Sequence, residues 1–144
     1  MLENRELLVV VTTPEGKVYN HRSYSVSAEA IDGGITILPN HAPIMLPLKI
    51  GELQVKRFLE DSPTDYIAIG GGIMEVRDNI VTVIANVAER ARDIDVGRAE
   101  QARDKAEAII QDKNCSKSEV ERAKIALNKA INRIGVSKHR RLKQ

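Results

Sequence analysis

With 144 residues, the chain has the length of one ordinary domain, so two modules sharing it would each have a small core. No apolar run reaches the roughly 18 residues that a membrane-spanning helix needs. The single cysteine, Cys115, excludes an intramolecular disulfide, and we interpret it as an incidental loop residue. Residues 1–6 are too charged for a signal peptide, so we expect a protein of the cytosol or of a membrane surface.

The formal net charge of +2 hides an uneven distribution. Residues 1–88 contain 7 Lys and Arg against 11 Asp and Glu, a net charge of −4, whereas residues 89–144 contain 15 against 9, a net charge of +6. The second part should therefore prefer an anionic partner, such as an acidic protein surface, a nucleotide or a nucleic acid. It contains no aromatic residue on which a base could stack, which argues against single-stranded nucleic acid.

Short apolar runs, rich in β-branched residues and separated by turn residues, indicate strands from residue 7 to residue 85. The alternation within residues 23–28 predicts that Tyr24, Val26 and Ala28 face the core. Polar turns are expected at residues 14–17, 32–34, 60–63 and 77–79. The predicted strands span residues 7–13, 18–19, 23–28, 35–38, 52–56, 66–69, 73–76 and 80–85.

Two prolines make residues 38–43 a rigid corner, because proline cannot sit inside a sheet ladder. His41 is the titratable residue of this corner, and it has no partner at metal-ligand spacing. It either holds the corner together through hydrogen bonds or acts as a ligand or proton relay.

Three consecutive glycines, residues 70–72, follow a predicted strand and suggest a phosphate cradle. Such a cradle must open a helix whose N-terminal amides hold the phosphate, and here another strand pattern follows instead. We therefore interpret the glycines as a bulge or a close crossing of strands.

The pattern after residue 93 is helical, with apolar residues three and four apart. Asp93 or Asp95 could cap a first helix that runs to about residue 111, and Ser116 with Glu119 forms a capping box for a second. Gly135 should end the second helix, which leaves residues 136–144 as a frayed basic tail. The expected apolar stripes are Val96, Ala99, Ala102, Ala106, Ile109 and Ile110 on the first helix, and Ala123, Ala126, Leu127, Ala130, Ile131 and Ile134 on the second.

The seam between these helices is mostly alanine, and a buried methyl group contributes only about 0.8 kcal/mol against 1.5–3 for a buried leucine. We therefore hypothesise that the helical part is a movable element. The predicted fold is an N-terminal antiparallel β-sandwich (residues 1–88) followed by a two-helix antiparallel hairpin (residues 89–137) and a basic tail (residues 138–144).

Three segments, in this order and followed by an alanine-rich hairpin, resemble the epsilon subunit of rotary ATP synthases. They are GITILPNHAP at residues 34–43, AIGGGIMEV at residues 68–76, and AERA at residues 88–91 with IDVGRA at residues 94–99. The resemblance implies a non-catalytic subunit that couples the membrane rotor ring to the catalytic head. Its sandwich would bind the gamma subunit and touch the ring, and its mobile hairpin would inhibit ATP hydrolysis.

Some members of that family bind ATP on the folded hairpin, which makes ATP a regulatory ligand and not a required cofactor. The corresponding residues here are Glu89, Ile94, Asp95, Arg98, Ala99 and Arg133. Arginine takes phosphate oxygens in pairs, and a carboxylate can accept from an adenine amino group or a ribose hydroxyl. Lys105 and Lys129 stand where ATP-binding members are expected to have arginine, which predicts weak affinity.

The resemblance also implies that the extended hairpin meets an acidic segment of the beta subunit. The candidate contacts are Lys117, Arg122, Lys124 and Lys129, with Arg133 beside them. It places the protein on the cytoplasmic face of a bacterial membrane, without insertion into the bilayer and without nucleic acid as a partner. The alternative function is a nucleic-acid-binding adaptor that uses the basic hairpin. A nucleotide hydrolase lacks the phosphate-binding loop motif it would need.

Overall fold

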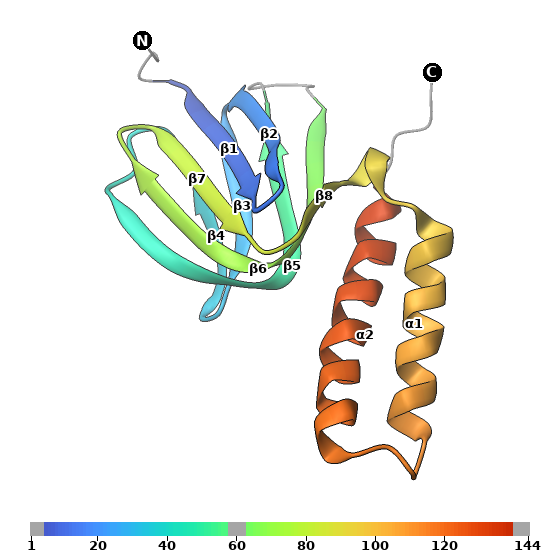
Figure 1. Cartoon of the computed structure of the whole chain (residues 1–144). Helices are drawn as coiled ribbons and strands as arrows, with labels where there is room; N and C mark the ends of the chain where they lie inside the picture. The colour runs from blue at the N-terminus through green and yellow to red at the C-terminus, as the bar shows by residue number, and fades with distance from the viewer. Residues whose placement is uncertain (1–4, 58–62, 140–144) are drawn as a thin grey trace. The chain divides into compact units, whose positions relative to one another are not determined.

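The computed structural model describes residues 5–57 and 63–139. The chain separates after Arg90 into two compact units. The first contains the strands and the second contains the helices (Figure 1).

The first unit is a β-sandwich with a mixed sheet. Its strands are β1 (Leu7–Thr13), β2 (Gly16–Ser23), β3 (Ser25–Ala30), β4 (Gly33–Ile37), β5 (Ile44–Lys56), β6 (Thr64–Arg77), β7 (Ile80–Ala85) and β8 (Ala88–Arg90). They pair in the order β2-β1-β7-β6-β5-β3-β4, and β8 also pairs with β6. The predicted sandwich is confirmed, but β1 and β7 run parallel, so the sheet is not purely antiparallel.

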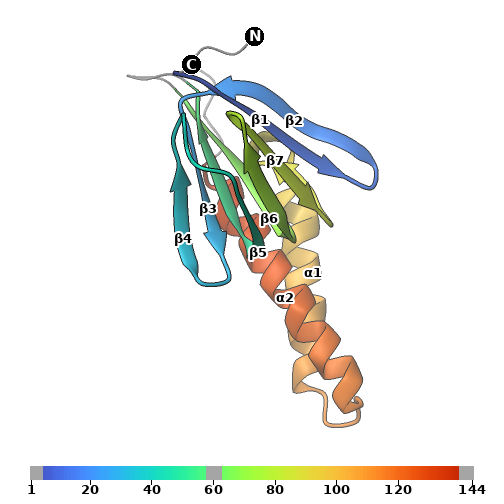
Figure 2. The same cartoon turned by 90° about the vertical axis from the view of Figure 1, so that its left-hand side faces the viewer.

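Two long strands, β5 and β6, organise this unit and curve round its core (Figure 2). The sequence predicted only short pieces of them, and the beginning of β5, residues 44–51, was missed. Because Pro47 interrupts the apolar pattern there, the segment does not read as a strand. The core between the layers is aliphatic, and its largest buried members include Leu7, Ile37, Leu53, Ile67, Met74 and Val81.

Two local predictions need correction, and a third cannot be compared with the structure. Tyr24 is half-buried in a bend between β2 and β3, whereas Val26 and Ala28 face the core as predicted. Gly33 and Gly34 belong to β4, because glycine at position 33 reaches a φ of +126° and lets the strand begin directly after the turn. The predicted turn at residues 60–63 and the aromatic residue Phe58 fall largely outside the described residues, which resume at Pro63.

The predicted close approach of strands is confirmed at Gly72. A Cβ atom there would lie 2.2 Å from the carbonyl oxygen of Ile84 on β7. Its neighbour Gly71 has a φ of +90°, which a residue with a side chain rarely adopts. Around these glycines, β6 changes partner on one edge, from β8 at residues 67–69 to β7 at residues 72–77.

The corner at residues 38–43 is held by local hydrogen bonds. His41 Nδ1 and the carbonyl oxygen of Ala42 lie 2.6 Å apart, which agrees with a role of this imidazole in the corner itself. The backbone N–H of Asn40 donates to Asn79 Oδ1 at 2.6 Å, so the corner is tied to the turn between β6 and β7.

The second unit begins with a short 3₁₀ helix, η1 (Ala91–Asp93), and continues as an antiparallel hairpin of α1 (Val96–Gln111) and α2 (Lys117–Ser137). Gly135 does not end α2, which continues to Ser137, so Val136 and Ser137 are buried helix residues and not part of a tail. In α2, Ala126 and Ile131 are exposed and lie outside the buried stripe. Residues 140–144 of the predicted tail are outside the described part of the chain.

Candidate functional site

The first turn of α1 carries the central part of the predicted nucleotide motif. Asp95 is the N-cap: its Oδ1 accepts a hydrogen bond from the backbone N–H of Arg98 at 3.1 Å. This resolves the choice between Asp93 and Asp95, because Asp93 lies in η1. The side chain of Arg98 is exposed, as expected for a residue that could reach a ligand. A carboxylate accepts several hydrogen bonds, so Asp95 can cap the helix and still accept a hydrogen bond from a ligand.

Two other residues of the predicted motif are buried. Ile94 is 2% exposed and Ala99 is 0% exposed. Buried aliphatic side chains stabilise the start of α1 by packing, so polar contacts to a ligand would come from the charged residues of the motif.

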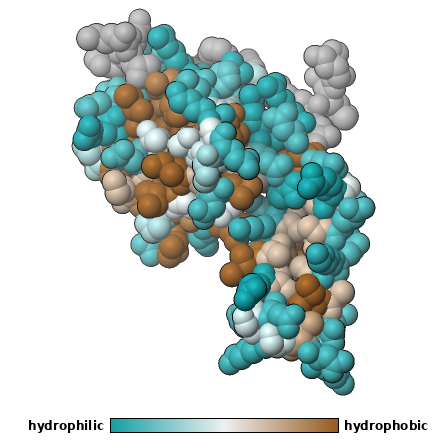
Figure 3. All heavy atoms as spheres, viewed as in Figure 1, coloured by the Kyte–Doolittle hydropathy of each residue, from teal (hydrophilic) through white to brown (hydrophobic). Residues whose placement is uncertain are grey.

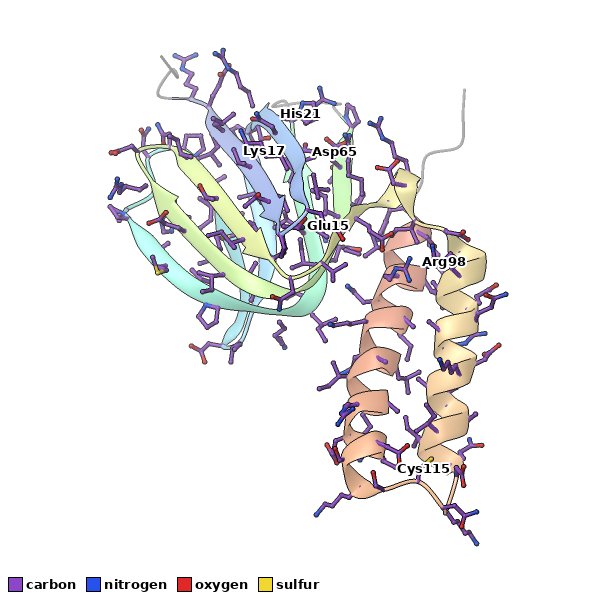
Figure 4. All side chains as sticks on the ribbon, viewed as in Figure 1. Glu15, Lys17, His21, Asp65, Arg98 and Cys115 are labelled. Carbon is purple, nitrogen blue, oxygen red and sulfur yellow. The ribbon has the colours of Figure 1, made fainter. Side chains whose placement is uncertain are left out.

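Arg133 lies four residues before the end of α2 and is half-buried. Because the two helices run antiparallel, the last turns of α2 lie at the same end of the hairpin as the first turn of α1, where Figure 4 shows Arg98. The structure thus places the Arg98 and Arg133 helix segments at one end of the hairpin. Glu89 is different, since it belongs to β8 in the sandwich unit.

Small residues line the contact between α1 and α2. The buried residues are Ala99 and Ala106 on α1, and Ala123, Ala130, Val136 and Ser137 on α2. Ser137 Oγ donates back to the carbonyl oxygen of Ile134 at 2.6 Å, which satisfies this buried hydroxyl within its own helix. The seam is therefore closely packed but contains little apolar area.

The predicted contacts for an acidic partner do not share one face of α2. Arg122, Lys129 and Arg133 are seven and four residues apart, so they form one stripe, which we call the arginine stripe. Lys117 and Lys124 form another, because two residues from Arg122 to Lys124 turn the helix by about 200°. Lys124 Nζ also lies 3.7 Å from Glu121 Oε1, which partly neutralises this second stripe.

The tip of the hairpin is a capped turn. The predicted capping box is present: Ser116 Oγ accepts from the Glu119 N–H at 3.1 Å, and Glu119 Oε1 accepts from the Ser116 N–H at 2.9 Å. The hydrogen bonds from Ser116 lower the pKa of the Glu119 carboxyl group. Cys115, at the opposite end of the hairpin from Arg98 (Figure 4), has its pKa raised by desolvation and by Asp112, so its thiol is not activated.

An exposed apolar surface of the sandwich was not found from the sequence. Cross-strand pairing puts Ile73 directly beside Ile84, and places Met45 on the same side of the sheet. Exposed fractions are 65% for Met45, 56% for Ile84, 47% for Ile73 and 39% for Ile80, and we call these four residues the outer apolar face (Figure 3). The nearly continuous apolar run of β7, interrupted by Thr82, was the available signal, because a strand covered on one side only should alternate.

A polar cluster inside the sandwich was also missed. The hydroxyl of Tyr19, on β2, donates to Asp65 Oδ2, on β6, at 2.5 Å, and Arg57 Nε lies 3.8 Å from the same carboxylate oxygen. Burial, and then the hydrogen bond to Asp65, raises the pKa of Tyr19 well above its ordinary value. His21 packs against the Tyr19 ring, with 4.7 Å between centroids, and Figure 4 shows His21 and Asp65 on their strands.

Within the described residues, no helix combines the length and the apolar character that crossing a bilayer would require.

These features define a class: a β-sandwich with an exposed apolar face, joined to a basic helical hairpin, is built to bind other proteins. A family model described as "ATP synthase, Delta/Epsilon chain, beta-sandwich domain" matches residues 6–91. A second, described as "ATP synthase, Delta/Epsilon chain, long alpha-helix domain", matches residues 92–138. The chain belongs to the delta/epsilon chain family of ATP synthase, and it is a non-catalytic central-stalk subunit of the F-type enzyme.

Solved structures show the same fold. A chain of the Euglena gracilis mitochondrial ATP synthase (OSCP/F1/c-ring, rotational state 1) is 20% identical with a TM-score of 0.73, over 89% of this chain and 79% of that one. A chain of the Tetrahymena thermophila mitochondrial ATP synthase central stalk and c-ring is 14% identical with a TM-score of 0.54, over 94% of this chain and 99% of that one.

Proposed function

We propose that this subunit couples the rotor ring to the catalytic head through its sandwich and regulates ATP hydrolysis through its hairpin. The observation that carries the proposal is the division of the chain after Arg90 into two compact units with different surfaces. One unit has the outer apolar face and the other has the arginine stripe. In this proposal the subunit works on the cytoplasmic side of a bacterial membrane, where it touches the ring without entering the bilayer.

The proposed occupant of the outer apolar face is the gamma subunit. Four large aliphatic side chains gathered on one sheet face are unusual for a protein that works alone, and they suit a permanent partner in the same stalk. Apolar anchors at the centre of an interface contribute most of its binding energy.

The gamma contact is tested by calorimetric binding of the full chain to purified gamma. Ile84→Lys should weaken binding at least about tenfold, because it puts a charge on the face directly beside Ile73. Ile125→Lys is the matched control, since Ile125 is 53% exposed on α2, outside the sandwich unit. Equal effects of the two substitutions on binding, or no effect of Ile84→Lys, would contradict the proposal that gamma binds this face.

The seam of α1 and α2 supports a hairpin that can move. Its four buried alanines each contribute about 0.8 kcal/mol of transfer energy, roughly half or less of what a buried leucine gives. A partner or ligand with a few kcal/mol of preference can therefore change the arrangement of the helices. In the proposed mechanism, the extended hairpin acts as a brake on ATP hydrolysis.

The arginine stripe is the better candidate for an acidic segment of the beta subunit, because it carries three cations and has no carboxylate between Arg122 and Arg133, although Glu119 lies one turn before Arg122. Inhibition of hydrolysis should be lost when Arg122 and Lys129 are both changed to alanine. The double change of Lys117 and Lys124 to alanine removes the same charge from the other side of α2 and should leave inhibition intact. The reverse pattern would refute this assignment.

ATP is the proposed regulatory ligand of the hairpin, with Arg98 and Arg133 on its phosphates and Asp95 on its adenine or ribose. This assignment is supported by the exposed side chain of Arg98. It lies beside the N-cap residue Asp95, at the end of the hairpin that also carries Arg133. Since lysines stand at positions 105 and 129, we expect weak binding.

Equilibrium dialysis of the full chain with ATP tests this assignment. Arg98→Ala should lower the affinity about tenfold or more, because it removes a charge-assisted phosphate contact. Arg103→Ala is the control, since Arg103 Nε is already paired with Asp104 Oδ1 at 3.1 Å. No ATP binding by the unmodified chain, or equal losses in the two variants, would contradict an ATP-sensing hairpin.

A further inference from the structure

The last strand of the sandwich unit is followed directly by the first helical turn of the second unit. Arg90 is the last residue of β8 and pairs with Ile67 on β6, and Ala91 is already the first residue of η1. Ile94 and Asp95 follow η1 and belong to no helix or strand, so the units can change their relative orientation if β8 gives way or if η1 and these two residues do. Which of the two yields decides where the joint lies.

Judged by backbone pairing alone, β8 should detach easily from the sandwich, because it is only three residues long and pairs on β6 only through residues 67–69. Isolated short strand pairs are marginally stable. The side chain of its last residue adds a second attachment: Arg90 Cζ lies 5.1 Å from the centroid of the Tyr19 ring, within the range of a cation–π contact.

The Tyr19 ring is itself fixed. It is 2% exposed, and its hydroxyl donates to Asp65 Oδ2 at 2.5 Å, which ties β2 to β6. Arg57 Nε, 3.8 Å from the same oxygen, adds a charge beside that carboxylate. The end of β8 is therefore attached to β2 through the Tyr19 ring, and not only to the ladder of β6.

The other side of the junction is looser. In η1, the Ile94 N–H donates to the Ala91 carbonyl oxygen at 3.3 Å, which is long for an N–H···O bond. Three-residue 3₁₀ turns have poorer hydrogen-bond geometry than α-helices. Arg92 and Asp93 are exposed, so burial within residues 91–94 comes from the side chains of Ala91 and Ile94.

We propose that Tyr19 and Arg90 form an anchor that keeps β8 in the sandwich, so that residues 91–94, which are η1 and the following Ile94, form the joint when the hairpin moves. The inference rests on the proposed function only in that the hairpin moves at all. Tyr19 is a positioning residue in this account: it acts through Arg90 and not on any partner.

Hydrogen exchange of the full chain, without other subunits, tests the anchor independently of any effect on ATP hydrolysis. In the unmodified chain, the amides of residues 88–90 should be at least about tenfold better protected than those of residues 91–94. Tyr19→Phe keeps the ring but loses the bond to Asp65, and it should reduce protection at residues 88–90 about tenfold relative to the rest of the sandwich. Tyr24→Phe, at a half-buried tyrosine outside the cluster, is the control.

Arg90→Gln provides a second variant that leaves Tyr19 in place. It should lower protection of residues 88–90 several-fold, whereas Arg92→Gln, with the same charge change two residues later, should not. Trypsin should cut Tyr19→Phe faster after Arg90, with no change after Arg92. Equal protection on both sides of the junction, unchanged protection in Tyr19→Phe and Arg90→Gln, or a loss spread evenly over the sandwich would each overturn the anchor.

Discussion

Gly72 determines how closely β6 and β7 approach, and changing it to alanine tests the packing of the sandwich most sharply. The new Cβ atom would lie 2.2 Å from the Ile84 carbonyl oxygen and 2.9 Å from Ala85 Cα. Since contacts of Cβ atoms below 3.0 Å are essentially never seen, the strands must separate locally by at least 0.8 Å. A shift of that size breaks the ladder around the pair of Gly72 and Ala85.

The expected cost is about 3 kcal/mol, from overpacking against backbone and from the loss of one or two ladder hydrogen bonds. Urea unfolding of the full chain, followed by circular dichroism, measures it as a lower midpoint. Gly34→Ala is the control, because its Cβ would meet nothing closer than 3.9 Å, and its effect should stay within about 0.5 kcal/mol. If the free energies of unfolding of the two variants differ by less than about 1 kcal/mol, the close approach of the strands at Gly72 is wrong.

Three further predictions concern stability. The pKa of Tyr19 is raised in the folded chain, so its contribution to stability is complete below the ordinary tyrosine pKa of 10.0 and is lost as the pH rises above that value. The midpoint of urea unfolding should therefore fall at alkaline pH. Tyr19→Phe should flatten this fall, and Tyr24→Phe should not. Ser116→Ala should cost the start of α2 about 1 kcal/mol, seen as faster amide exchange at residues 117–120, and lowering the pH through the ordinary Glu119 value of 4.5 should weaken the same turn; exchange unaffected by both changes would contradict the capping box. Gly135→Ala should stabilise the end of α2 by up to about 1 kcal/mol, because Gly135 lies inside the helix with open space at its Cβ, and a loss of helix protection would contradict that placement.

Much of the sandwich was predictable because local signals agreed with tertiary packing. The strand at residues 80–85 and the one at residues 7–13 match β7 and β1, since each is a compact β-branched run between turn residues. The parallel pairing of these two strands was not predictable, because no local pattern states which strands become neighbours. The beginning of β5 was hidden by Pro47, which β5 accommodates opposite Ile73.

The hairpin shows both the reach and the limit of sequence patterns. The capping box at Ser116 and the N-cap at Asp95 were predictable, because a capping side chain binds amides two or three residues away. Gly135 misled the prediction, since glycine usually ends a helix but is tolerated where Val136 and Ser137 are buried beyond it. The exposure of Ile131 likewise depends on which face of α2 meets α1.

The candidate site was predictable only residue by residue. Spacing identified Asp95 and Arg98 as neighbours, but it did not show that Lys124 pairs with Glu121 on a different side of α2 from Arg122. The cluster of Tyr19, Asp65 and Arg90 joins strands far apart in the sequence, so it needs the sheet topology. The outer apolar face needs the register of β6 and β7 for the same reason.

The most direct test of the regulatory role is ATP hydrolysis by the assembled catalytic head and gamma, with either the full chain or a chain ending at Arg90, at low and high ATP. The account predicts that the full chain slows hydrolysis, that the shortened chain binds but does not, and that high ATP relieves the inhibition. Full and shortened chains that bind equally and leave the rate unchanged would contradict a regulatory hairpin and restrict the subunit to coupling and assembly.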